Sequence, residues 1–247
     1  MTTDEQGRAG ETRRVLVLSH TGREAARDVT SRLCKALTEH GIVVRLLAEE
    51  AADLGIESST FDPAIELHLD DTDLACDCEL AVVVGGDGSI LRAAEVTWGS
   101  GTPVLGVNLG HVGFLAEAEV EEVEPTIRAI VDASYAVEDR LTLDVEVIRG
   151  GEVVDRTFAV NEASVEKAAR ERMLEVIART DGIGVLWCDG RRAVDLPPGA
   201  RIEVRRAEQP VRLARLHQAP FTDRLVAKFD LPVQGWRGRR RSEGDVG

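Results

Sequence analysis

The chain has 247 residues, of which 43% are hydrophobic and 30% charged, and its formal net charge is −14. This length fits one large domain or two modest ones and can bury a core without disulfide or metal support. The acidic balance would repel polyanions, which argues against a nucleic-acid partner or an anionic membrane partner. No apolar run approaches the ~18 residues of a membrane span, and the polar first residues do not resemble a signal peptide. We therefore expect a cytoplasmic protein.

The N-terminal half alternates apolar runs with segments whose apolar residues recur three and four apart. After a disordered tail over 1–12, we predict strands over 14–19, 42–47, 79–84 and 103–107. Helical spacing predicts helices over 23–40, 89–98 and 119–133. Strands that alternate with helices are typical of a parallel sheet with crossover helices. We expect this α/β domain to extend over residues 13–136.

The pattern changes near Tyr135, where short alternating segments replace the helical spacing. Gly150-Gly151 is a hairpin signal and Pro197-Pro198-Gly199 is a turn signal. We predict strands over 141–148, 153–165, 184–187, 201–206 and 210–216. The second domain is thus expected to be rich in β-structure and to cover residues 137–216, with a polar tail over 239–247.

The strongest chemical signal is Gly85-Gly86-Asp87-Gly88, between a predicted strand and a predicted helix. Ligands bind at this end of the strands in open α/β sheets. Glycines let backbone N–H groups approach a phosphate, and a helix N-terminus favours anions. A carboxylate in such a loop suits a base toward a hydroxyl or a ligand to Mg²⁺. The alternative is a tight turn that only needs glycine.

Two further polar positions are weaker signals. Asn108 follows another strand end and could face the same crevice, although taken alone an ordinary loop is the better explanation. Asn161-Glu162 could hydrogen-bond a base and a ribose, although such a pair is more often a solvated strand end.

Other chemistries find little support. Cys76 and Cys78 have no matching His or Cys pair at zinc spacing, which argues against a metal centre. No serine-hydrolase elbow, P-loop or G-x-G-x-x-G occurs.

Six stretches, in order, resemble the NAD kinases of high-GC Gram-positive bacteria. They are VLVLSHTGR, ELAVVVGGDGSILRAAE, PVLGVNLGHVGFLAE, VEDRLTLDVEV, AVNEASVEK and APFTDRLVAKFDLPVQGWRG. The resemblance implies a Rossmann-like domain, then a β-sandwich-like domain, with residues 217–238 returning to the first. It also implies transfer of a phosphoryl group from ATP or polyphosphate to the 2′-hydroxyl of the adenosine ribose of NAD⁺. The resemblance further implies a divalent cation, usually Mg²⁺, and a cytoplasmic homodimer or homotetramer.

The resemblance also implies roles for single residues. Asp87 would accept the proton of the 2′-hydroxyl and contact the nucleotide. The other positions that it assigns to nucleotide binding are Gly86, Gly88, Arg92, Asn108, Asn161, Glu162 and, by a looser match, Arg172.

One part of the family pattern is absent from this chain. The Thr-Pro-Thr-Gly-Ser-Thr-Ala-Tyr run that follows the Asn-acid pair in the family does not occur. We expect an internal deletion near residues 176–180, with apolar sheet surface and strand edges left exposed. An impaired natural variant, an error in the sequence or a deliberate shortening would each explain it. Weak or absent kinase activity is the resulting expectation.

Two alternatives stay open. The first is another GGDG-type kinase, such as a lipid kinase or a phosphofructokinase, which the stretches outside the loop disfavour. The second is a catalytically impaired NAD-binding or assembly protein of the same family.

Overall fold

The structure is a computed structural model that describes residues 12–56, 64–108, 115, 118–119, 123–167, 184–216, 226 and 229. The helices are α1 (Glu24–Glu39), α2 (Ala48–Asp53), α3 (Asp87–Thr97) and α4 (Val123–Val131). The strands of the first half are β1 (Arg14–Ser19), β2 (Val43–Leu47), β3 (Ile65–His68), β4 (Leu80–Val84), β5 (Val104–Asn108), β6 (Ala118–Glu119) and β7 (Ala136–Arg140). Those that follow are β8 (Leu143–Arg149), β9 (Glu152–Ala159), β10 (Ala163–Lys167), β11 (Gly184–Cys188), β12 (Arg192–Leu196), β13 (Arg201–Arg206) and β14 (Val211–Arg215).

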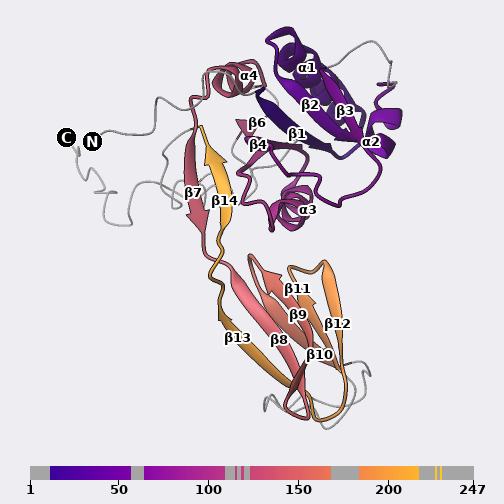
Figure 1. Cartoon of the computed structure of the whole chain (residues 1–247), viewed down its shortest axis with the longest axis vertical. Helices are drawn as coiled ribbons and strands as arrows, with labels where there is room; N and C mark the ends of the chain where they lie inside the picture. Colours follow the sequence, from indigo (N-terminus) through magenta and orange to yellow (C-terminus); the bar gives the residue numbers. More distant parts are fainter. Residues whose placement is uncertain are drawn as a thin grey trace, which may run out of the picture.

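The first part of the molecule is built on an eight-stranded sheet with the order β3-β2-β1-β4-β5-β14-β7, to which β6 adds beside β5 (Figure 1). Strands β1 to β6 are parallel, as the alternation of strands and helices predicts. Side chains from α1 and α4 cover one face of this sheet, and side chains from α3 cover the other. Because both faces are covered, β4 is buried along its whole length.

The second part holds two antiparallel sheets of three strands, with the orders β13-β8-β9 and β10-β11-β12 (Figure 1). Side chains from both sheets meet in one core, whose fully buried members include Val145, Val147 and Leu186. An α/β part followed by a β-rich part is the fold class that the sequence predicts. The chain crosses between the parts twice, after β7 and after β13 (Figure 1).

Several elements differ from their predictions. The helix predicted over 119–133 is observed as α4 only, because residues 118–119 pair with β5 as strand β6. The strand predicted over 153–165 is two strands, β9 and β10, because the backbone N–H groups at 160–162 turn to a carboxylate. Elements β3, β7, β12 and α2 were not predicted.

The predicted domain limits remain predictions, with one structural difference. Strand β14 and all of β7 except Ala136 lie within the residues assigned to the second domain, yet both strands pair in the sheet of the first part. The segment 217–238 lies outside the described residues except for 226 and 229. The predicted tail over 1–12 lies outside them except for residue 12. The tail over 239–247 and the expected deletion site at 176–180 lie wholly outside them.

Candidate active site

The site lies where the strand order of the large sheet reverses. Strand β1 has β2 on one side and β4 on the other, so the loops after β1 and β4 leave the carboxyl edge together. The His20 N–H donates to the Val84 carbonyl at 3.0 Å, which holds the two loops side by side. Such a switch point is the usual ligand crevice of an open parallel sheet. A pocket of about 540 Å³ opens there, lined by Leu18, Ser19, His20, Thr21, Gly22, Arg23, Gly86, Gly88, Ser89, Arg92 and Arg191.

The glycine loop after β4 forms one wall of this pocket. A Cβ on Gly85 would lie 2.4 Å from the Ser89 Oγ, so the close approach of Ser89 requires glycine there. A Cβ on Gly86 or Gly88 would meet no atom within 4 Å. Helix α3 begins directly after Gly86, so its N-terminal N–H groups and the positive end of its dipole lie at the pocket wall. This wall suits an anion, and the space beside the last two glycines is available to it.

Asp87, the first residue of α3, turns its carboxylate toward the chain that follows β5. Its Oδ1 accepts the Leu115 N–H at 3.2 Å. Asn108 ends β5 and is 6% exposed, and the Gly85 N–H donates to the neighbouring Val107 carbonyl at 2.9 Å. Asp87 and Asn108 therefore lie at the ends of the adjacent strands β4 and β5. A carboxylate in this position could accept a proton from a bound hydroxyl.

Arg92, the predicted binding cation, is oriented by a carboxylate that the sequence analysis did not single out. Its Nη1 donates to Glu50 Oε1 at 2.5 Å, and Asp71 lies 3.7 Å from its Nη2. Glu50 is buried and also accepts the Ser19 N–H at 2.8 Å. Burial raises the pKa of Glu50, although the hydrogen bonds from Ser19 and Arg92 oppose that rise. The pair fixes the guanidinium beside the pocket.

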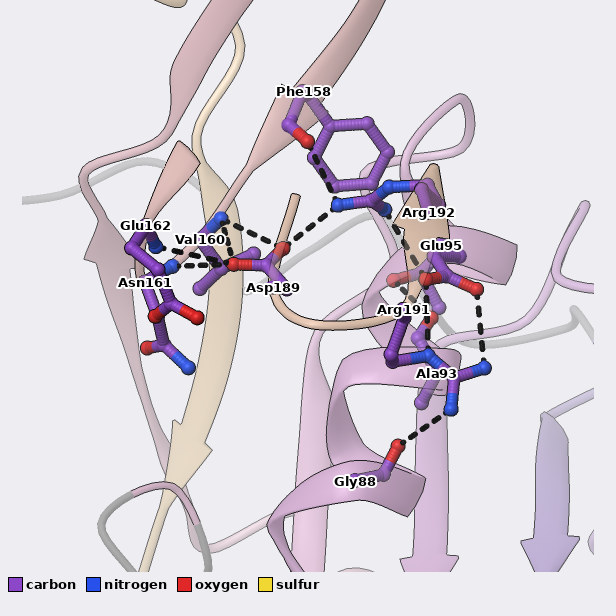
Figure 2. Close-up of polar contacts among 11 residues, drawn as sticks. Gly88, Ala93, Glu95, Phe158, Val160, Asn161, Glu162, Asp189, Arg191 and Arg192 are labelled. Carbon is purple, nitrogen blue, oxygen red and sulfur yellow. Dashed lines mark hydrogen bonds and ion pairs between the residues drawn. The ribbon is translucent and has the colours of Figure 1, made fainter. Parts of the chain in front are cut away.

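The second part of the molecule contributes to the site through one hairpin turn. Asn161 and Glu162 lie between β9 and β10 with exposed side chains, and their N–H groups donate to the Asp189 carboxylate (Figure 2). Asp189 opens the turn between β11 and β12. Arg191, from the same turn, lines the pocket.

The structure thus brings the glycine loop, Arg92 and Asn108 to the carboxyl edge of the large sheet. Gly86, Gly88 and Arg92 line the pocket, while Asn161 and Glu162 belong to the second part. Arg172 lies outside the described residues. Sequence reasoning missed four groups, namely the loop at 20–23, Glu50, Asp189 and Arg191. The loop could have been found, because it follows the first strand and so belongs to the same carboxyl edge.

The described residues offer neither a metal cluster nor a helical membrane span. No three His, Cys, Asp or Glu side chains among these residues gather where they could hold a metal ion. No helix within the described part of the chain has the length and apolar character of a membrane span.

Comparisons with known proteins agree with the fold and the motifs. The family described as ATP-NAD kinase N-terminal domain matches residues 15–135. An NAD kinase of Thermobifida fusca is 41% identical over 317 aligned positions, which cover 98% of this chain and 97% of the relative. NAD kinase 2 of Streptomyces coelicolor is 41% identical, with 92% and 97% covered. The crystal structure of yeast NADH kinase with NADH has a TM-score of 0.68, with 94% of this chain and 91% of that chain covered; at 12% identity it supports the fold only.

The length of the Thermobifida alignment bears on the missing segment. The alignment has 317 positions and this chain has 247 residues, so at least 70 positions of the alignment have no counterpart here. Almost the whole of each chain is aligned, so these positions are internal. This finding supports an internal deletion, and its predicted place near 176–180 stays a prediction.

Proposed function

The chain belongs to the NAD kinase family, and we propose that it transfers a phosphoryl group from ATP or polyphosphate to the 2′-hydroxyl of the adenosine ribose of NAD⁺. The observation that carries this proposal is the GGDG loop, which opens α3 at the switch point of the parallel sheet beside a pocket of about 540 Å³. The match to NAD kinases over nearly the whole chain favours this activity over a lipid kinase or a phosphofructokinase.

The residues of the site would have different roles in such a reaction. Phosphoryl transfer depends mainly on positioning and on electrostatic stabilisation of the transferred group. The N–H groups at the start of α3 would bind phosphate oxygens. Asp87 would accept the hydroxyl proton, because a carboxylate near the attacking oxygen can take it as the bond to phosphorus forms. Arg92, Asn108, Asn161 and Glu162 would hold the dinucleotide.

The proposal includes Mg²⁺ as the divalent cation. Mg²⁺ keeps several waters and takes only one or two carboxylates beside the phosphates of a nucleotide. Because Asp87 is assigned the proton transfer, the phosphates of the nucleotide would bring the ion to the site, and no residue of the chain is assigned to it. Bound there, Mg²⁺ would supply charge neutralisation at the phosphates.

The proposal extends to assembly and location. Following the family resemblance, we expect a cytoplasmic homodimer or homotetramer. Size-exclusion chromatography with light scattering measures the assembly, and a monomer at micromolar concentration would contradict this part of the proposal.

The test of the activity is NADP⁺ formation by the purified 247-residue chain with NAD⁺, Mg²⁺ and either ATP or polyphosphate. We expect Asp87→Asn to lower the rate by about 10²–10⁴-fold, the range for loss of a general base. The matched control is Asp28→Asn on α1. The side chain of Asp28 is 70% exposed, and the residue is distant in sequence from the glycine loop. An Asp87→Asn protein as active as this control would remove Asp87 from the chemistry.

A second candidate function follows from the 70 or more missing alignment positions. If the missing segment supplies contacts needed for transfer, the chain is an NAD-binding protein of the same family without turnover. Calorimetric titration with NAD⁺ separates the two, because binding without NADP⁺ formation identifies the second function. A folded chain that does neither would overturn both.

A further inference from the structure

The buried carboxylate of Asp189 gathers three successive backbone N–H groups. The Val160 N–H donates to both carboxylate oxygens at 3.0 Å. The N–H groups of Asn161 and Glu162 both donate to Oδ1, at 2.7 and 3.4 Å. The Asp189 N–H returns a hydrogen bond to the Glu162 carbonyl at 3.0 Å. The Asp189 side chain is 1% exposed, so water does not compete for these bonds. The backbone of Asn161 and Glu162 is thereby fixed, and Figure 2 shows both side chains pointing away from Asp189.

The same turn reaches α3, the helix that begins with Asp87. Arg191 donates from Nε and Nη2 to the two oxygens of Glu95 at 3.1 and 3.4 Å, and its Nη1 lies 3.4 Å from the Gly88 carbonyl (Figure 2). Arg192 lies 3.3 Å from Glu95. Two arginines of the second part therefore hold one carboxylate of α3, two helical turns after Asp87.

Arg192 joins these two sets of contacts. Its Nη2 donates to Asp189 Oδ2 and to the Phe158 carbonyl, both at 2.7 Å. Its guanidinium lies 3.8 Å from the centre of the Phe158 ring, and Phe158 stacks on Trp98, just after α3, with ring centres 4.1 Å apart. Packing and charge thus act together to hold the turn against the helix.

We propose that Asp189 is a positioning residue that fixes the Asn161-Glu162 segment and, through Arg192 and Glu95, sets its place relative to the Asp87 loop. This role rests on the proposed function, in which Asp87 and the Asn161-Glu162 pair bind the same dinucleotide. The two come from different parts of the molecule, so their relative position needs a link across the parts. The turn at 189–192 provides that link.

The first variant is Asp189→Asn. Asp189 has a φ of +56°, a region that asparagine tolerates as well as aspartate does, so the backbone of the turn is preserved. The amide removes the negative charge and places an NH₂ group among N–H donors and Arg192. We expect the KM for NAD⁺ to rise about tenfold or more, with the KM for ATP changed less than about twofold, because the lost contacts lie on the dinucleotide side.

A purely structural role predicts a different result. A partly unfolded variant has fewer active molecules, which lowers the apparent kcat and leaves both KM values unchanged. That pattern in Asp189→Asn would overturn the proposal. The matched control is Asp195→Asn, an exposed position on the adjoining strand β12, which we expect to keep wild-type constants.

The second variant is Glu95→Gln, which leaves the Asp189 contacts in place and weakens the link to α3. We expect a severalfold loss of kcat with a smaller change in the KM for NAD⁺, because the segment still binds but lies less well aligned with Asp87. Wild-type values for both constants would overturn the link through Glu95.

The wild-type chain distinguishes a failure of this role from a failure of the proposed function. If it binds NAD⁺ without forming NADP⁺, the dissociation constants of the wild type, Asp189→Asn and Asp195→Asn replace KM, and Asp189→Asn should bind about tenfold more weakly. Equal dissociation constants would overturn the proposal. If the folded wild type does not bind NAD⁺ at all, the proposed function fails, and the dinucleotide role of Asp189 fails with it.

Discussion

The two parts of the molecule bury their strands in different ways. Every residue of β4 in the first part is buried, because helices cover both faces of the parallel sheet. In the second part, β9 is exposed over its first five residues and becomes buried only at Ala159. The first part is held together by layers of packed side chains. The second part holds its Asn161-Glu162 segment by backbone hydrogen bonds to Asp189, and it meets α3 through ion pairs and the stack of Phe158 on Trp98.

The largest expected effect tests this difference directly. Leu80 in β4 is fully buried, and replacing it with alanine leaves a cavity in the large sheet. We expect Leu80→Ala to lower the free energy of unfolding by about 3 kcal/mol. Val154 in β9 is 53% exposed, and we expect Val154→Thr to change it by less than about 0.5 kcal/mol. Urea unfolding followed by circular dichroism measures both.

A Val154→Thr protein as unstable as Leu80→Ala would contradict the comparison. It would mean that the exposed face of β9 is covered in solution by residues outside the described part or by another chain. Light scattering before and after the substitution identifies the second case.

An intermediate effect is expected inside the glycine loop. Gly85→Ala places a Cβ 2.7 Å from the Ser89 Cβ, which cannot move without the helix, so we expect a loss of about 1–3 kcal/mol in stability. Gly88→Ala meets no protein atom within 4 Å and replaces a helical glycine. We expect its melting temperature to be unchanged or higher, while NADP⁺ formation falls because the Cβ occupies space needed by the phosphates.

Gly85→Ala tests a glycine that packing requires, and Gly88→Ala tests a glycine that a ligand requires. Thermal unfolding and the NADP⁺ assay are measured on both proteins. Full activity in a stable Gly88→Ala protein would show that no substrate approaches this side of the loop.

The first part was the more predictable from sequence because its central strands are buried on both faces. A strand buried on both faces is a continuous apolar run, and the run at 14–19 coincides with β1. Strand β7, Ala-Val-Glu-Asp-Arg, is mostly exposed and carries no such pattern. The run over 153–165 looked continuous, but its centre bends to Asp189, almost 30 residues further along the chain. Periodicity reports local burial and cannot report that contact.

The candidate site, like the fold, was predictable only where local sequence pattern places the residues. Gly86, Asp87 and Gly88 come just after β4, and Asn108 is the last residue of β5, so the parallel topology alone brings them to one edge. Glu50, Asp189 and Arg191 act through partners distant in sequence, and acidic or basic residues in an acidic, charge-rich chain give no signal of such partners. Their roles required the structure.

The smallest expected effect compares ion pairs in the two parts. Burial by itself raises the pKa of Glu66 in β3, but hydrogen bonds from Arg45 and Arg14 outweigh it and hold the pKa below its ordinary 4.5. A carboxylate with a lowered folded-state pKa stabilises the fold above 4.5, and this contribution is lost as pH falls through the lowered value. At neutral pH we therefore expect Glu66→Gln to cost about 1 kcal/mol or less. The difference from wild type should shrink toward zero in acid.

The matched pair in the second part is Glu146 with Arg156, whose hydrogen bond lowers the pKa of Glu146. Arg156 is 65% exposed, whereas Arg45, the partner of Glu66, is 9% exposed. Salt screens exposed charges more strongly than buried ones. We therefore expect high salt to reduce the loss of unfolding free energy caused by Glu146→Gln more than the loss caused by Glu66→Gln. Urea titrations in low and high salt measure both losses. Equal salt sensitivity, or an effect of Glu66→Gln that grows in acid, would show that polar contacts hold both parts in the same way.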